Sequence, residues 1–205
     1  MPETRTPTAS SACVACGAPR LSPAVCAECG ELFDFPEDPF TLLGLTRSWS
    51  LDSAALEERY AELTRAVREK SAPRGDLGER VGQAVTALDA ARRRLSDPVE
   101  RAQYLLISYG GAEREKPLRK REFQSEVMEF EQAATNARQE SDPARVTSVV
   151  LEAEEKLASA IMAAGQSFTR LERSLVEEVG SAADALAEAR FWRRKVDELR
   201  EVLGH

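Results

Sequence analysis

Histidine is almost absent from this sequence. The chain of 205 residues contains one histidine, His205, which is also the last residue. Because terminal residues are seldom held in place, we expect no imidazole in an organised site. This excludes Ser-His-Asp and Cys-His nucleophilic catalysis, and any zinc site that needs a histidine ligand. The acidic residues are spaced as on helix surfaces rather than paired, so we expect that the protein is not an enzyme.

Aromatic residues and long apolar runs are scarce as well. Aromatic side chains make up 6% of the residues, and alanine, glutamate, arginine and leucine dominate, which favours helices. No apolar run approaches the ~18 residues needed to span a bilayer. Residues 1–12 lack the apolar core of a secretory signal and are too polar to pack, so we expect a flexible tail there. These absences predict a cytoplasmic protein with no membrane partner.

The chain also lacks an excess of positive charge. It has 28 basic and 35 acidic residues, which give a net charge of −7 at pH 7. An acidic chain binds nucleic acid poorly unless it carries a local basic patch. The basic run at residues 114–122 fits a solvated linker better than such a patch, because charge runs usually face water. We therefore expect no nucleic-acid partner.

The four cysteines all lie near the N-terminus. Cys13-x-x-Cys16 and Cys26-x-x-Cys29 are each followed by glycine, and a two-residue gap lets both thiolates of a pair reach one ion from a tight turn. Two such turns are typical of a closed, structural zinc site with four cysteine ligands. We therefore predict a zinc-ribbon-like module over residues 13–34.

Other uses of these cysteines have less support. A thioredoxin-like dithiol would need a βαβ context, which the surrounding sequence lacks. A nucleic-acid-binding ribbon would need basic residues, but Arg20 is the only one between Cys13 and Cys29, and Glu28 opposes it. Iron in the same tetrahedron stays open as an alternative to zinc.

The middle of the chain, residues 36–112, carries short helical patterns separated by turn signals. Aspartate followed by proline, at residues 38–39 and 97–98, is typical of a helix start. Asp52 is a third candidate cap, and apolar residues after it recur at helical spacing.

Long helical patterns fill residues 123–205, after a linker at residues 113–122. Three such patterns with short connections predict an antiparallel three-helix bundle. In the last of them Phe191 and Trp192 are adjacent, so both cannot face the core. The expected fold is all-α: a small zinc module, a helical middle domain and a helical bundle.

Several segments resemble the HscB family of J-domain co-chaperones in iron–sulfur cluster assembly. They are DPFTLLGL (38–45), LDSAALEERYAEL (51–63) and LSDPVERAQYLL (95–106), the last of which is close to the RAEYLL signature of the family. The bundle also looks like the scaffold-binding domain of HscB, and the cysteine-rich module is similar to that of eukaryotic HscB proteins.

This resemblance implies a fold and a set of partners. Residues 36–112 would form a J-domain, which stimulates ATP hydrolysis by a DnaK/HscA-type chaperone. It does so with a basic second helix and a His-Pro-Asp tripeptide in the loop after it. Residues 123–205 would bind the cluster scaffold IscU and deliver it to the chaperone. Proteins of this family are not themselves enzymes and bind no nucleotide.

The tripeptide itself is missing. In an ungapped alignment its three positions fall on Arg68, Glu69 and Lys70. Glu69 removes the fixed φ of proline, which shapes the loop. Lys70 reverses the charge of the aspartate that should meet an arginine of the chaperone, and a like-charge meeting would oppose docking.

The second helix is weakened too, because residues 51–70 carry four basic and five acidic residues. Arg65 and Arg68 lie about one turn apart and could share a face toward the chaperone, or merely solvate the helix. Arg65, Arg68, Glu69 and Lys70 are thus the residues of a degenerate chaperone contact. We predict that stimulation of the chaperone ATPase is lost or nearly lost.

The scaffold-binding surface implied by the resemblance retains the family's residue type at only about half of its positions. Its positions fall on Gln124, Ser125, Met128, Glu129, Gln132 and Phe191. Gln124 and Ser125 replace apolar residues, whereas Gln132 replaces an acidic one. Met128 could face a partner or belong to the core. The resulting hypothesis is an HscB-like protein that binds an IscU-type scaffold. The alternative is a helical, zinc-containing adaptor with no link to a chaperone.

Overall fold

The computed structural model describes residues 12–20, 22–70, 77–112, 121–140, 142–174 and 178–203. These residues are mostly helical, and the extended pairings among them are two isolated β-bridges beside the cysteines. The predicted all-α fold is therefore confirmed. The chain divides into two compact units, residues 1–101 and 102–205, and the boundary falls inside a helix. Within the described ranges, no helix is both long enough and apolar enough to cross a membrane.

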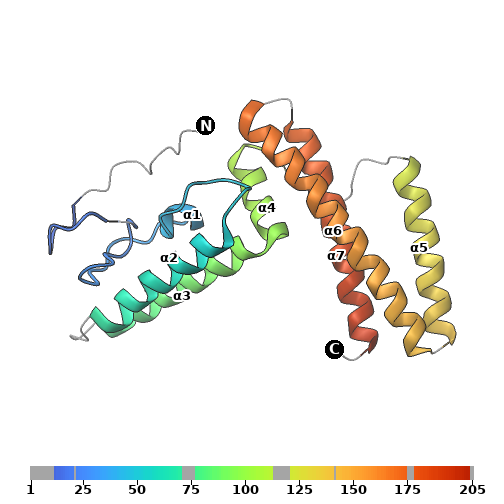
Figure 1. Ribbon diagram of the computed structural model, residues 1–205, viewed down its shortest axis with the longest axis horizontal. Helices are drawn as coiled ribbons and strands as arrows, with labels where there is room; N and C mark the ends of the chain where they lie inside the picture. Colours follow the sequence, from blue (N-terminus) through green and yellow to red (C-terminus); the bar gives the residue numbers. More distant parts are fainter. Residues whose placement is uncertain are drawn as a thin grey trace. The chain divides into compact units, whose positions relative to one another are not determined.

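In the first unit, a series of helices follows the cysteine module (Figure 1). They are α1 (Pro39–Leu42), α2 (Ser53–Arg65) with the π-helical turn η1 (Ala66–Lys70), α3 (Leu77–Ser96) and the start of α4 (Pro98–Ser108). Asp38, Asp52 and Asp97 cap three of the helix starts, as the sequence predicts. Each carboxylate accepts a hydrogen bond from the backbone N–H two residues later.

Helices α2 and α3 lie side by side and form much of the core of this unit (Figure 1). At their edge the Tyr60 hydroxyl donates to the Asp89 carboxylate at 2.5 Å. The Arg92 guanidinium pairs with Glu57 at 2.8 Å. These contacts fix the register of the two helices. Their buried residues include Leu56, Leu63, Leu88 and Leu95.

The second unit contains the end of α4 and three long helices, α5 (Arg121–Glu140), α6 (Pro143–Ser174) and α7 (Val179–Leu203). Helices α6 and α7 pack against each other over much of their length (Figure 1). Small buried side chains on both helices allow this close packing, among them Ala153, Ala160, Ala183 and Ala187. Helix α5 packs on α6 and reaches α7 through larger side chains.

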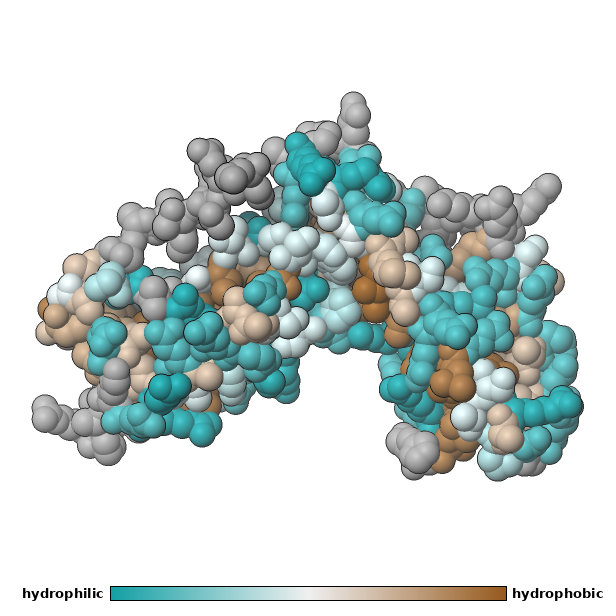
Figure 2. All heavy atoms as spheres, viewed as in Figure 1, coloured by the Kyte–Doolittle hydropathy of each residue, from teal (hydrophilic) through white to brown (hydrophobic). Residues whose placement is uncertain are grey.

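The face of the molecule in Figure 2 is mainly hydrophilic, with hydrophobic residues in small patches. Large apolar side chains that are exposed among the described residues are Val14, Ile107, Met128, Leu151, Met162 and Val202. Apolar residues scattered singly are normal on a protein surface. An exposed apolar residue therefore carries weight only where it belongs to a surface identified on other grounds.

Candidate metal centre and protein-binding surfaces

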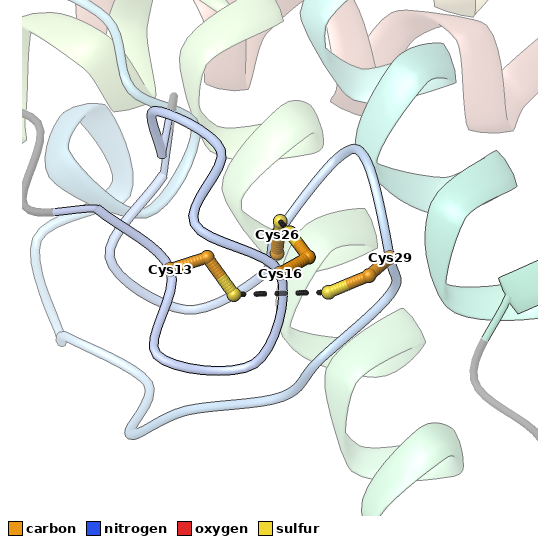
Figure 3. A group of neighbouring side chains, drawn as sticks. All are labelled: Cys13, Cys16, Cys26 and Cys29. Carbon is orange, nitrogen blue, oxygen red and sulfur yellow. Dashed lines mark hydrogen bonds between the residues drawn. The ribbon is translucent and has the colours of Figure 1, made fainter.

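The four cysteines converge on one point in the first unit (Figure 3). Their sulfur atoms all lie within 4.8 Å of one another, and the Cys13–Cys29 and Cys16–Cys26 sulfur pairs are each 3.7 Å apart. Zinc–sulfur bonds of about 2.3 Å in a tetrahedron would place the sulfurs about 3.8 Å apart. Each of these pairs takes one cysteine from each Cys-x-x-Cys segment, so both segments surround one centre that can hold a metal ion.

The two Cys-x-x-Cys-Gly segments have the same backbone geometry. In each, the glycine N–H donates to the carbonyl of the first cysteine at 2.8 Å. Gly17 and Gly30 both have a φ of 75°, a left-handed conformation that disfavours residues with a Cβ. This requirement explains the glycine after each cysteine pair. The repeated turn presents the sulfurs from two equivalent directions.

Burial and hydrogen bonding act differently on the individual thiols. Burial raises the pKa of Cys13, but hydrogen bonds from the backbone N–H groups of Ala15 and Cys16 and from neighbouring thiols bring it down to about 7. Burial and the neighbouring thiols raise the pKa of Cys29 to about 12. Four thiolates this close would repel one another, so a cation is needed to hold all of them deprotonated.

Polar contacts attach the cysteine module to the helices of its own unit. The Oγ of Ser22, which is 2% exposed, donates to the Leu42 carbonyl at 2.6 Å and accepts from the Ala24 N–H at 3.1 Å. Arg80 of α3 donates to the carbonyl of Leu32 at 3.2 Å. The cysteine module is thus joined to α1 and α3 by hydrogen bonds.

The residues at the tripeptide positions lie in helical backbone. Helix α2 continues directly into η1, which runs to Lys70, and the side chains of Arg68 and Glu69 are exposed. No proline interrupts this turn, so no backbone N–H is lost and no ring clashes with the preceding turn. The Lys70 side chain and residues 71–76 lie outside the described part of the chain.

Ion pairing changes the charge that α2 presents. Glu57 is paired with Arg92 of α3, and Glu62 is paired with Arg59 at 2.7 Å. Arg65 is exposed, as is Arg68 in η1, and neither has an ion-pair partner among the described residues. The free charge at this end of α2 is therefore more basic than a count along the sequence indicates.

One exposed face of α5 carries all the predicted scaffold contacts of that helix. Met128 is 73% exposed, so the structure places it outside the core. The polar neighbours include Gln132, whose amide donates to the Asn136 side-chain oxygen at 2.9 Å. This surface, which we call the α5 face, consists of Gln124, Ser125, Met128, Glu129 and Gln132, and all five side chains are exposed.

Phe191, the sixth predicted contact, belongs to an aromatic cluster between α5 and α7. Its ring meets Phe123 edge to face with the ring centres 5.6 Å apart. Trp192 meets Phe130 in the same manner at 5.1 Å, and both are 1% exposed. Phe191 is only half-buried, so it lies at the rim of the cluster, beside the first turn of α5.

Two lysines that the sequence analysis did not single out tie α5 to the other helices. Lys156 of α6 pairs with Glu126 at 2.6 Å, and Lys195 of α7 pairs with Glu131 at 2.7 Å. Burial alone would lower the pKa of both lysines, but the neighbouring carboxylates raise it above the usual value. No sequence signal could find these pairs, because ion pairs between helices depend on a register that only packing sets.

Comparison with known proteins gives a consistent result. No family model matches the chain. The "Co-chaperone protein HscB homolog" of Shewanella halifaxensis is 29% identical over 171 residues, which cover 80% of this chain and 95% of that protein. The protein of the same description from Shewanella pealeana is 28% identical with the same coverage.

Solved structures of the same type share the fold. The crystal structure of human co-chaperone protein HscB matches with a TM-score of 0.71 at 22% identity, over 93% of this chain and 97% of that chain. Chaperone HscB from Vibrio cholerae matches with a TM-score of 0.61 at 23% identity, over 82% of this chain and 98% of that chain. The chain is thus similar in sequence to HscB co-chaperone homologues and shares the fold of the solved HscB structures, and it carries a four-cysteine cluster near its N-terminus.

Proposed function

We propose that the protein is a cytoplasmic co-chaperone of iron–sulfur cluster assembly that binds an IscU-type scaffold through the α5 face and Phe191. The observation that carries this proposal is the α5 face itself, where five positions implied by the resemblance are all exposed on one side of one helix. Gln124 and Ser125, one turn before the exposed Met128, are polar, so Met128 and Phe191 supply the apolar contact.

The proposal includes a DnaK/HscA-type chaperone that this protein contacts without stimulating its ATPase. Glu69 and Lys70 stand where the family pattern has proline and aspartate, and the backbone there is helical. The unpaired Arg65 and Arg68 can still meet an acidic surface of the chaperone. In this proposal, residues 36–112 act as a degenerate J-domain and residues 123–205 as the scaffold-binding domain.

The proposed metal is zinc, held by Cys13, Cys16, Cys26 and Cys29. The sulfur spacing fits a tetrahedral ion, and zinc would supply a structural cross-link between the two turns. Four protein ligands leave no open position for a substrate. Elemental analysis of protein purified without chelators should find about one zinc per chain. Cys16→Ser should lose it and Val14→Ser should keep it, whereas iron in place of zinc would contradict the assignment.

Two binding experiments test the function. Immobilised protein should retain an IscU-type scaffold, and single-turnover ATP hydrolysis by the host's DnaK/HscA-type chaperone should not accelerate when the protein is added. Strong stimulation would defeat the claim of a lost trigger. Retention of neither scaffold nor chaperone would favour the alternative, a zinc-containing helical adaptor.

A further inference from the structure

We infer that Lys156 and Lys195 are positioning residues that hold α5 in place and thereby set the affinity of the α5 face for its partner. The inference about affinity rests on the proposed binding of a scaffold to this face. Neither lysine belongs to the face itself, since Lys156 lies on α6 and Lys195 on α7.

Helix α5 is attached to α7 by side chains alone. Among the residues that the structure describes, no Cα atom of α5 comes within 8 Å of a Cα atom of α7. The space between them is filled by the edge-to-face contacts of Phe123 and Phe130 with Phe191 and Trp192. Edge-to-face ring contacts exclude water from this space. They restrict the direction of the α5 axis less than close packing of the two helix backbones would.

The two lysines form matching contacts with this cluster. The Lys156 ammonium pairs with Glu126 of α5 and lies 5.3 Å from the centre of the Trp192 ring. The Lys195 ammonium pairs with Glu131 of α5 and lies 5.7 Å from the centre of the Phe191 ring. Each lysine therefore joins a carboxylate of α5 to an aromatic ring of α7.

A second carboxylate, from the lysine's own helix, holds each ammonium in place. Glu152 lies 3.7 Å from Lys156, and Glu198 lies 2.9 Å from Lys195. Each ammonium thus contacts one carboxylate of α5 and one carboxylate of its own helix, so it bridges the two helices. The lysine side chains are 22% and 19% exposed, so water screens these contacts less than those of a fully exposed pair.

The anchored glutamates are adjacent in sequence to residues of the α5 face. Glu126 follows Ser125, and Glu131 precedes Gln132, so the two bridges hold both ends of the face. A rotation or displacement of α5 would move Met128 relative to Phe191, which is fixed on α7. If α5 were loose, a partner that contacts both Met128 and Phe191 would have to order the helix on binding. The free energy of this ordering would reduce the affinity of the partner.

Amide hydrogen exchange and scaffold binding, measured on the full chain, test this inference. Lys156→Met with Lys195→Met keeps the apolar stems on the rings but removes both charges. We expect exchange in residues 123–137 to accelerate about three- to tenfold, with α6 and α7 unchanged, and the affinity for an IscU-type scaffold to fall by a similar factor. Lys156→Arg with Lys195→Arg should retain wild-type exchange and most of the affinity.

Two further variants separate the possible outcomes. Glu126→Gln with Glu131→Gln should reproduce the loosening without altering either lysine. Arg200→Met removes an ion pair with Glu154 that joins α6 and α7 at 2.5 Å, and should leave exchange in α5 unchanged. Unchanged exchange in the lysine variant, or accelerated exchange with full affinity, overturns the inference. If the wild type itself fails to bind the scaffold, the proposed function fails, and exchange in α5 still decides whether the lysines hold the helix.

Discussion

Glu69 stands at the position where the J-domains that the sequence resembles carry proline, and the backbone around it is helical. Glutamate has an N–H to donate and is a good helix former, so α2 extends into η1 as far as Lys70. Proline at this position would remove that N–H and end the helix near residue 68. Replacement of Glu69 by proline is therefore expected to convert this helical turn into a loop.

Under the proposed function, introducing the tripeptide should therefore confer stimulation of the chaperone ATPase. We expect Arg68→His with Glu69→Pro and Lys70→Asp to raise chaperone ATPase turnover several-fold over the wild type, because the charge opposing the chaperone arginine is removed. Circular dichroism should show a small loss of helix.

Glu69→Pro alone is the control, and it should lose the same helix without gaining activity. If the triple variant does not stimulate the chaperone ATPase, the second helix, α2, has also lost its contact with the chaperone.

Sequence reasoning succeeds for residues whose spacing dictates their chemistry. The cysteines could be assigned to one centre because a two-residue gap followed by glycine restricts the local turn. Met128 could not be assigned to core or surface, because it adjoins the apolar stripe of its helix. Lys156 and Lys195 could not be found at all, since their partners lie 30 and 64 residues away in the sequence.

At the scale of elements, α5 combines two different surfaces. One side is buried through Phe130, Ala134 and Ala137, and the opposite side carries the α5 face. The periodicity of apolar residues predicts the helix and its buried side. It does not predict how far α5 lies from α7, because that distance depends on which large side chains meet between them.

A charge placed at the centre of the α5 face should disrupt binding. Met128→Glu is expected to weaken the affinity for an IscU-type scaffold about tenfold or more, because a buried contact would have to desolvate a carboxylate. Isothermal titration calorimetry can measure the change.

Met162→Glu on α6 is the matched control, since Met162 is also largely exposed, at 65%. It should leave affinity unchanged, and an equal effect of both variants would contradict the location of the surface.

Alkaline pH should weaken the hold of the two lysines on α5. Their pKa values in the folded chain are raised above the usual value of 10.5. When the pKa of a group is higher in the folded than in the unfolded state, its charged form stabilises the fold. This stabilisation is complete below the pKa of the unfolded state, about 10.4 for lysine, and is lost as pH rises through the pKa of the folded state. We expect the melting-temperature difference between wild type and the double Lys→Met variant to be constant up to about pH 10 and to shrink above it. A difference that stays constant through about pH 12 would contradict this assignment.

At the scale of the whole molecule, the order of parts follows from the sequence, but the limits of the compact units do not. The basic run at residues 113–122 predicts a linker, most of which lies outside the described residues, whereas the contacts divide the chain into compact units between Arg101 and Ala102, within α4. A helix gives no sequence signal where its contacts change from one unit to another. Only tertiary packing decides such a boundary.

Removal of the proposed zinc ion should destabilise the first unit and spare the second. The cysteine module is bonded to α1 and α3 through Ser22 and Arg80, so loss of the ion removes support from the first unit only. Differential scanning calorimetry with a strong chelator should show one transition lowered by about 5 °C or more and the other unchanged. The Cys16→Ser variant should not respond to the chelator, and a uniform shift of both transitions would contradict this prediction.

The contacts within the bundle differ in their response to solvent. Helices α6 and α7 meet through alanines and other apolar groups, whose association strengthens with sulfate and weakens on cooling. Helix α5 is additionally held by charges, whose attraction falls as dissolved ions shorten the screening length to about 8 Å at physiological ionic strength. A rise in sulfate concentration therefore strengthens the apolar contacts of both α6–α7 and α5 but weakens the lysine–glutamate bridges, so the surrounding salt level shifts which contacts hold α5 in the bundle.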